Sequence, residues 1–288
     1  MALLHVNFYS KTLRMASSID VILPEPAQGI GVDGSAWDGV ELLPCLYLLH
    51  GTTDDHTIWQ RRTSIERYCA GRKLAVVMPN GHLSAYCNQK YGHNYLDFIT
   101  KELPDFCSKM FRISTKREDT FIAGLSMGGY GALKAGLNYP EKYAMAAGLS
   151  SGVDRLCHLP EEWQDFKSPA EFEHLREENY PLFDQLSHFM MNFGSPAEYL
   201  ASEQNNLFLL IRKQVERGVE LPKLYLSCGT EDPLAWEPNV RFRALLDELK
   251  VPYFWEEAPG VHEWRLWDLF IQTVLDQLPM KDNKMAVL

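Results

Sequence analysis

Residues 120–129, TFIAGLSMGG, indicate how this chain folds. The first four residues are apolar or β-branched, as is typical of a buried strand. Gly124-Leu125-Ser126-Met127-Gly128 follows directly, and a helical pattern begins near Met127. A tight turn from a strand into a helix strains the backbone of its central residue, so small residues are needed on both sides. The stretch therefore predicts a strand, a sharp turn at Ser126 and a helix.

The same succession of strand and helix patterns continues along the chain, because short apolar runs alternate with helix-length segments. Continuous apolar runs, unlike alternating ones, suit strands that are buried on both faces of a parallel sheet. The expected strands cover residues 4–9, 18–23, 45–49, 74–78, 120–123, 144–149, 223–227 and 253–255. The expected helices cover residues 58–70, 95–110, 128–138, 240–249 and 264–278. This alternation predicts an α/β fold with a mostly parallel, eight-stranded sheet flanked by helices.

The 288 residues are interpreted as one domain, residues 1–288. Residues 153–221 show no convincing strand and carry Phe and Met among many acidic residues, so they are expected to form a helical cap inserted between two strands. A Gly/Pro-rich loop is expected at 25–39 and a frayed tail at 280–288.

Charge and composition exclude several classes of partner. Asp and Glu number 38 against 28 Lys and Arg, giving a net charge of −10 with no basic stripe. This argues against nucleic acid and anionic membranes as partners and favours neutral small-molecule substrates. No signal peptide or spanning segment is evident, so a cytoplasmic location is expected. A homo-oligomer is left open.

The six cysteines show neither a C-x-x-C pair nor a Cys/His zinc spacing. They are interpreted as free thiols in a reducing compartment, because a chain of this length can stabilise itself through its core. No metal and no cofactor are expected.

Ser126 is the candidate nucleophile, since the turn would present its hydroxyl at a helix amino terminus, where partial positive charge favours a developing anion. A serine needs a base. His262, in a loop between the last strand and the last helix, is favoured over the other eight histidines because it follows the serine in the chain and can reach across the sheet. Asp232, after the strand at 223–227, is the candidate carboxylate, with Glu231 as a close competitor and Asp154 as a remote one.

Two backbone N–H groups are expected to bind an oxyanion. One is that of Met127, directly after the serine, and the other is that of Thr52 in the turn His50-Gly51-Thr52. His50 is then a support for the loop and not a base. Trp59, Trp236 and Trp264 are candidates for an apolar wall around the substrate, although core packing explains each of them as well.

Several stretches resemble the esterase D / putative esterase family of α/β-hydrolases, and in particular its tributyrin esterase branch. They are residues 6–11, residues 48–51 with Trp59, residues 124–132, and residues 260–264 with Trp267 and Asp268. The resemblance spans about 4–278 and is weakest at 153–221. It implies the α/β-hydrolase fold, Ser126, Asp232 and His262 as a triad, and Thr52 and Met127 as oxyanion donors.

The sequence thus predicts a serine carboxylesterase that hydrolyses short-chain acyl esters through an acyl-enzyme. The same triad would serve a carbohydrate acetyl or feruloyl esterase, or a thioesterase of the S-formylglutathione hydrolase type. A catalytically silent binding protein on the same fold is the alternative that is not an enzyme.

Overall fold

The computed structural model describes residues 1–26, 34, 37–157, 159 and 180–280, and side chains are not described for 180–185. The described residues form one eight-stranded sheet with the order β1-β2-β4-β3-β5-β6-β7-β8. The strands are β1 (Ala2–Ser10), β2 (Met15–Leu23), β3 (Cys45–Leu49), β4 (Ala75–Pro79), β5 (Thr120–Leu125), β6 (Met145–Leu149), β7 (Lys223–Gly229) and β8 (Tyr253–Ala258). Strand β2 runs antiparallel to β1 and β4, whereas β4, β3, β5, β6, β7 and β8 pair in parallel.

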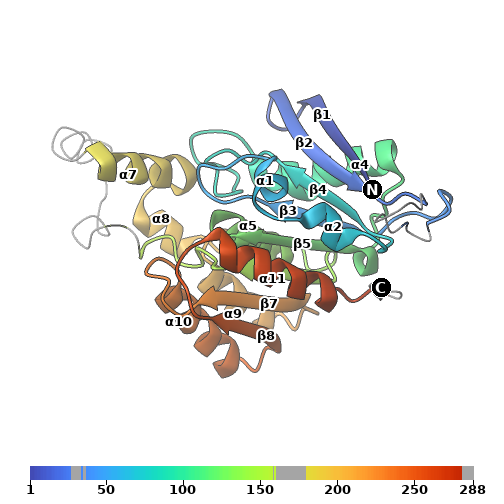
Figure 1. The fold of residues 1–288 in the computed structure, drawn as a ribbon. Coiled ribbons are helices and arrows are strands. Elements are labelled where there is room, and N and C mark those ends of the chain that lie inside the picture. The colour runs from blue at the N-terminus through green and yellow to red at the C-terminus, as the bar shows by residue number, and fades with distance from the viewer. Residues whose placement is uncertain (27–33, 35–36, 158, 160–179, 281–288) are drawn as a thin grey trace.

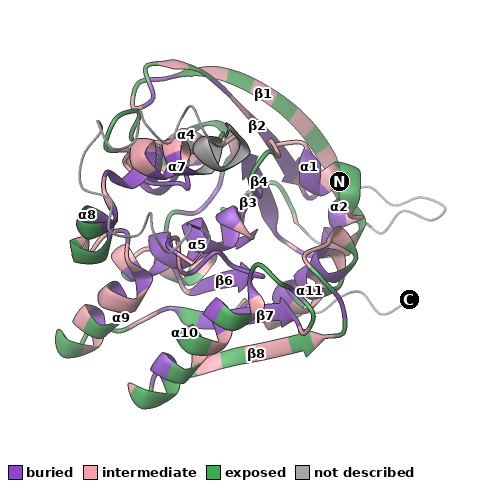
Figure 2. Ribbon diagram, turned by 90° about the vertical axis from the view of Figure 1, so that its left-hand side faces the viewer, coloured by how far each residue is buried: buried purple, intermediate pink, exposed green. Residues whose placement is uncertain are grey.

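Helices cover both faces of the sheet, as Figures 1 and 2 show. The helices are α1 (Ile58–Arg62), α2 (Ile65–Cys69), α3 (Tyr95–Asp97), the π-helix η1 (Phe98–Glu102), α4 (Leu103–Phe111), the 3-10 helix η2 (Arg117–Asp119), α5 (Met127–Asn138), α7 (Tyr180–Phe193), α8 (Pro196–Ala201), α9 (Leu207–Glu216), α10 (Trp236–Glu248) and α11 (Trp264–Gln277). Side chains of α1, α2 and α11 form one apolar core with the sheet, and those of α4, α5, α9 and α10 form the other. The result is a three-layer α/β sandwich.

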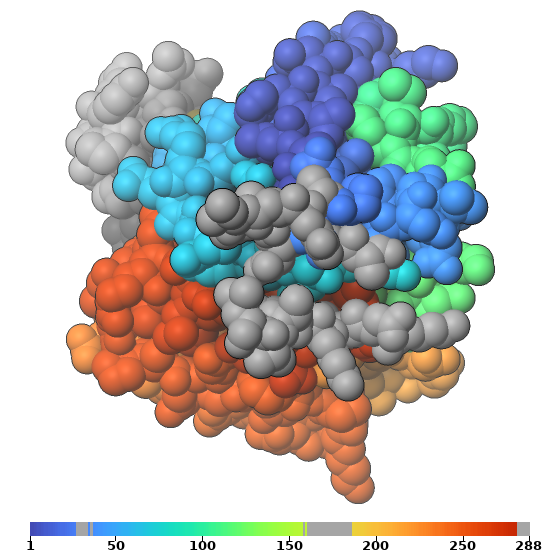
Figure 3. All heavy atoms as spheres, turned by 45° about the vertical axis from the view of Figure 1, so that its right-hand side comes forward, coloured from blue at the N-terminus to red at the C-terminus, as the bar shows by residue number. Residues whose placement is uncertain are grey.

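The burial of each strand depends on its position in the sheet. Every residue of β3, β4, β5 and β6 is buried, as expected for strands covered on both faces. Strand β1 instead alternates between partly buried and exposed residues, which suits the edge of the sheet. In the space-filling view of Figure 3, the dark-blue N-terminal segment lies at the top and the orange-red C-terminal segments lie at the bottom.

All eight expected strands are confirmed, with their ends shifted by up to three residues. The expected helix at 58–70 is two helices, and the one at 95–110 begins as α3 and a π-helix. Helices α7, α8 and α9 lie between β6 and β7, where an insertion was expected, but residues 158 and 160–179 of it lie outside the described residues. Residues 281–288 of the expected tail and most of residues 27–36 of the expected loop also lie outside the described residues.

Two further expectations concern the cysteines and membranes. All six cysteines are free, and five of them are buried. Within the described ranges, every helix is too short or too polar to cross a bilayer.

Candidate active site

Ser126 joins β5 to α5 with a strained backbone, at φ 51° and ψ −115°. Such angles are costly for a residue with a side chain and persist only where the surroundings fix them. Here the Ser126 N–H donates to the Leu149 carbonyl at 2.8 Å, and the Ser126 carbonyl accepts from the N–H groups of Tyr130 and Gly152 at 3.0 and 3.1 Å. Neighbouring strand β6 and helix α5 thus hold the predicted turn in place.

Gly128 allows the first turn of α5 to approach the end of β3. A Cβ on Gly128 would lie 2.4 Å from the Leu49 carbonyl oxygen, and a Cβ on Gly124 would lie 2.4 Å from the Gly128 backbone. Both distances are far shorter than carbon contacts allow, so only glycine fits at either position. The two glycines of the motif therefore bring the Ser126 turn against the loop that carries Thr52.

His262 lies in the loop between β8 and α11 and reaches the serine. Its Nε2 is 3.0 Å from Ser126 Oγ, and its Nδ1 is 2.7 Å from Asp232 Oδ2. The ring of Trp267 packs edge-on against the imidazole, with 4.9 Å between ring centroids. Such a chain can pass a proton from a serine hydroxyl to an imidazole whose orientation is fixed by a carboxylate.

Asp232 follows β7 and is buried. Its Oδ1 accepts from the N–H groups of Leu234 and Ala235, both at 2.9 Å, which leaves Oδ2 for His262. Burial by itself would raise the pKa of Asp232. The hydrogen bond and charge of His262, with the two backbone N–H groups, outweigh burial and hold that pKa below its usual value. Asp232 is thus kept ionised beside the imidazole.

The structure does not bring the two competing carboxylates to His262. Glu231 is exposed, and only its backbone N–H is engaged, by the Gly260 carbonyl at 3.0 Å. Asp154 instead pairs with Arg241 at 2.8 Å. Asp232 is therefore the carboxylate that contacts the imidazole.

Thr52 and Met127 flank Ser126 in one cavity. Met127 is the first residue of α5, so its N–H has no acceptor within the helix. His50, directly before this turn, is buried, and its Nε2 accepts from the Gly81 N–H at 2.8 Å while its Nδ1 lies 2.7 Å from the Gly51 carbonyl oxygen. Burial lowers the pKa of His50 to about 4, so it is neutral and supports the loop, as expected.

The cavity has a volume of about 540 Å³, and Ser126 is part of its lining. It is formed by the loops after β3, β4, β6, β7 and β8 and by α7, so the carboxyl ends of the strands meet the helical insertion there. Its lining includes Thr52, Asp54, Leu83, Ala85, Ser126, Met127, Arg155, Leu159, His188, Phe189, Asn192, His262 and Trp267. A second cavity of about 540 Å³ adjoins it, shares Asp54, Leu83 and His188 with it, and adds His82, His93, Tyr91 and Tyr95.

The three tryptophans expected around the substrate do not line either cavity in the described part of the chain. Trp59 is fully buried and donates its indole N–H to the Leu49 carbonyl at 3.0 Å. Trp264 packs edge-on against Trp59, and Trp236 packs against Trp255. Each is used in core or helix packing, the alternative that the sequence had left open.

Among the described tryptophans, Trp267 lines the cavity, and the sequence did not single it out for that role. It lies three residues after Trp264 on α11, so both rings fall on neighbouring positions of one helix face. Helical periodicity predicts that both side chains face the protein interior. Only the tertiary packing decides which of the two rings contacts His262.

Comparisons with known proteins identify the family of the chain. The family model described as Putative esterase matches residues 34–277. An acetyl esterase of Caldicellulosiruptor saccharolyticus is 30% identical over 281 residues, covering 96% of this chain and 97% of that protein.

Two solved structures from Staphylococcus aureus are also similar. FphF, a fluorophosphonate-binding serine hydrolase, is 34% identical with a TM-score of 0.78, covering 97% of this chain and 99% of that one. The S-formylglutathione hydrolase FrmB is 33% identical with a TM-score of 0.76, over the same shares of the two chains. The chain therefore belongs to the Putative esterase family, has the α/β-hydrolase fold and is a carboxylic ester hydrolase.

Proposed function

We propose that the chain is a serine carboxylesterase that hydrolyses short-chain acyl esters through a Ser126–His262–Asp232 triad and an acyl-enzyme. The observation that supports this best is the continuous hydrogen-bonded chain from Ser126 Oγ through both nitrogens of His262 to Asp232 Oδ2. The acetyl esterase relative and the resemblance to the tributyrin esterase branch support a short acyl group.

In the proposed reaction, His262 Nε2 accepts the Ser126 proton as Oγ attacks the ester carbonyl carbon. The N–H groups of Thr52 and Met127 stabilise the oxyanion. His262 then gives the proton to the departing alcohol, and an acyl-Ser126 ester remains. Water, deprotonated by His262, attacks this ester and releases the acid, which restores the Ser126 hydroxyl.

The substrate partner is proposed to be a small molecule held in the 540 Å³ cavity. Its volume is at the lower end of the range for drug-sized ligands, which favours small esters. Leu83 and Phe189 supply apolar wall, and Phe189 comes from α7 of the insertion. The cap at 153–221 within a single domain remains a prediction that this arrangement supports.

A thioesterase of the S-formylglutathione hydrolase type is the second candidate, supported by the 33% identity to FrmB. A carbohydrate ester hydrolase is a third, supported by the adjoining cavity, whose histidines and tyrosines offer polar and aromatic contacts to a large polar leaving group. Both would use the same triad, so only the leaving group separates them from the first proposal.

The test has two parts. A fluorophosphonate probe is expected to label Ser126, as mapped by mass spectrometry, and Ser126→Ala is expected to lower kcat on p-nitrophenyl acetate and butyrate by on the order of 10⁴–10⁶. Labelling of the neighbouring Ser150 instead, or near-full turnover by Ser126→Ala, would contradict the proposal. Rates on p-nitrophenyl esters of rising chain length, an S-acyl thioester and acetylated xylo-oligosaccharides then rank the three substrate classes.

A further inference from the structure

Arg155 is a cation that lines the cavity, and no described residue provides a counterion for it. It follows β6 by six residues, is partly buried and lines the cavity beside Ser126. Among the described residues no carboxylate forms an ion pair with it, and its Nε is shielded from solvent without any hydrogen-bond partner. Its backbone N–H donates to Tyr199 Oη at 3.3 Å.

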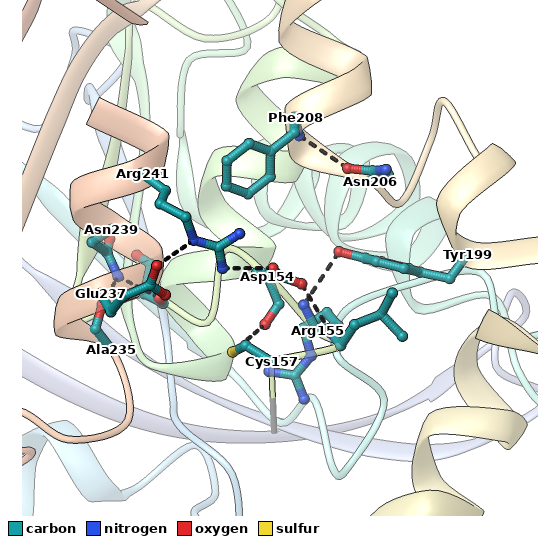
Figure 4. A network of polar contacts seen from close by, with 12 residues as sticks. Asp154, Arg155, Cys157, Tyr199, Asn206, Phe208, Ala235, Glu237, Asn239 and Arg241 are labelled. Carbon is teal, nitrogen blue, oxygen red and sulfur yellow. Dashed lines mark hydrogen bonds and ion pairs between the residues drawn. The ribbon is translucent and has the colours of Figure 1, made fainter. Parts of the chain in front are cut away.

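The nearby carboxylates are occupied elsewhere. Asp154, the preceding residue, pairs with Arg241, which also binds Glu237 at 2.7 Å. Figure 4 shows both of these contacts, and no dashed line in it reaches the guanidinium of Arg155. Within the cavity, Asp232 is committed to His262.

Asp54 is the other carboxylate of the cavity lining. Burial raises the pKa of Asp54, and the charges that act on it further belong to Asp55, Arg62 and Arg61. No ion pair between Asp54 and Arg155 is found among the described residues, which leaves the guanidinium without this carboxylate as a counterion.

A second cation, Lys134, adds to the positive charge near Arg155. Lys134 is fully buried and donates to the Ala85 carbonyl at 3.0 Å. Both cations flank the ring of Tyr130, Lys134 at 4.5 Å and Arg155 at 5.7 Å from its centroid. Burial first, and to a lesser degree the charge of Arg155, lower the pKa of Lys134 to about 8. Two cations therefore lie beside the Tyr130 ring, and of these Arg155 lines the cavity.

The guanidinium also lies close to the reacting serine. A Cβ on Gly152 would lie 2.6 Å from Arg155 Nη1 and 3.9 Å from the Ser126 carbonyl oxygen. Gly152 itself donates its N–H to that oxygen at 3.1 Å. Because Arg155 and Ser126 line the same cavity, a small substrate that reacts at Ser126 can place a second group, a few bonds away, at Arg155.

A partly buried charge without a partner is costly, and a ligand of opposite charge removes the cost. We propose that Arg155 binds a carboxylate of the substrate, so that the esters hydrolysed by this chain carry a carboxylate a few bonds from the scissile carbonyl. This rests on the proposed function of Ser126. One accessible guanidinium, with Lys134 sealed in the core, matches the single charge and planar fork of a carboxylate.

The overall charge of −10 does not oppose this. Net charge describes the field around the whole molecule, whereas binding inside a cavity depends on the few charges that line it. The preference for neutral substrates suggested by composition therefore does not extend to the acyl or leaving group that reaches Arg155.

Two matched pairs of esters test the proposal in a pH-stat. Monoethyl succinate against ethyl pentanoate places the carboxylate on the acyl side, and 4-acetoxybutanoate against pentyl acetate places it on the leaving group. We expect the wild type to favour the charged member of one pair in kcat/KM. Arg155→Met is expected to lower that charged-to-neutral ratio roughly 10- to 100-fold, and Arg155→Lys by less. The ester pair whose charged-to-neutral ratio falls in Arg155→Met shows whether Arg155 contacts the acyl group or the leaving group of the substrate.

Arg212→Met is the matched control, because this exposed arginine pairs with Glu248 away from the cavity and its loss changes the net charge equally. Its ratio should equal that of the wild type. A wild-type ratio at or below one in both pairs, or an unchanged ratio in Arg155→Met, would overturn the proposal. If Arg155→Met does not fold, the wild-type preference is expected to fall as salt rises from 20 to 300 mM (roughly a twofold change or more), and a salt-independent ratio counts against it. Full turnover by Ser126→Ala would instead refute the proposed function itself.

Discussion

Gly229 is packed against Gly260 so closely that a Cβ on Gly229 would lie 2.4 Å from the Gly260 carbonyl oxygen. The two loops are also joined by hydrogen bonds from the N–H groups of Thr230 and Glu231 to the carbonyls of Ala258 and Gly260, both at 3.0 Å. One loop carries Asp232 and the other carries His262. Their close approach is what brings the carboxylate within 2.7 Å of the imidazole.

Gly229→Ala is expected to separate these loops and to lower kcat by about 10- to 100-fold, because small misplacements of reacting groups are costly. KM should change less, since most of the cavity lining comes from other loops and from α7. Stopped-flow or steady-state kinetics on p-nitrophenyl butyrate measure this. Gly218→Ala, on a glycine with no atom within 4 Å of the added Cβ, is the control and should keep wild-type kcat. Equal kcat for the two variants would show that the loop contact is unimportant.

Asp232→Asn is expected to lower kcat by on the order of 10⁴, because an amide neither fixes the imidazole tautomer nor stabilises the imidazolium. Glu231→Gln, one residue away and exposed, is expected to stay within about twofold of the wild type, a surface change of no consequence to the site. Steady-state kcat for the two variants decides the matter. A large loss in Glu231→Gln with a small one in Asp232→Asn would reverse the assignment of the carboxylate.

Trp267→Leu is expected to lower kcat/KM by about 10-fold, because it removes the ring that packs edge-on against His262 and lines the cavity. Trp236→Leu removes a ring of the same size that packs against Trp255 instead, and should leave kcat/KM unchanged. Kinetics on p-nitrophenyl acetate compare the two. If Trp236→Leu is the variant with the lower kcat/KM, the conclusion that Trp267 and not Trp236 lines the substrate cavity is wrong.

The lowered pKa of His50 is expected to make the free energy of unfolding depend on pH. Its pKa is lowered from 6.5 to about 4 by burial, so the folded state binds fewer protons than the unfolded state between these values. The stabilisation is complete above pH 6.5 and is lost as pH falls towards 4, by roughly 1–3 kcal/mol. His50→Gln should therefore show a shallower fall in the free energy of unfolding, measured by urea denaturation from pH 7 to 4.5. Parallel curves for the two proteins would contradict this.

Much of the sheet could be predicted from sequence because the signals are local. The strand β5, the turn at Ser126 and the helix α5 follow one another directly in the chain, and the central strands are continuous apolar runs. The break between α1 and α2 was missed. Thr63 Oγ1 binds the Trp59 carbonyl and accepts the Ile65 N–H, and this side-chain competition ends the first helix, an effect that apolar spacing does not reveal.

The sequence by itself determined the fold class, the turn at Ser126 and the chain order of Ser126, Asp232 and His262, because each depends on local residue pattern. Only the tertiary structure decided which side chains meet. It brought Trp267 rather than Trp264 to His262, directed Asp154 to Arg241, and left Arg155 in the cavity without a counterion from the described residues. These contacts join segments that are distant in the chain, and their partners depend on how the strands and helices pack.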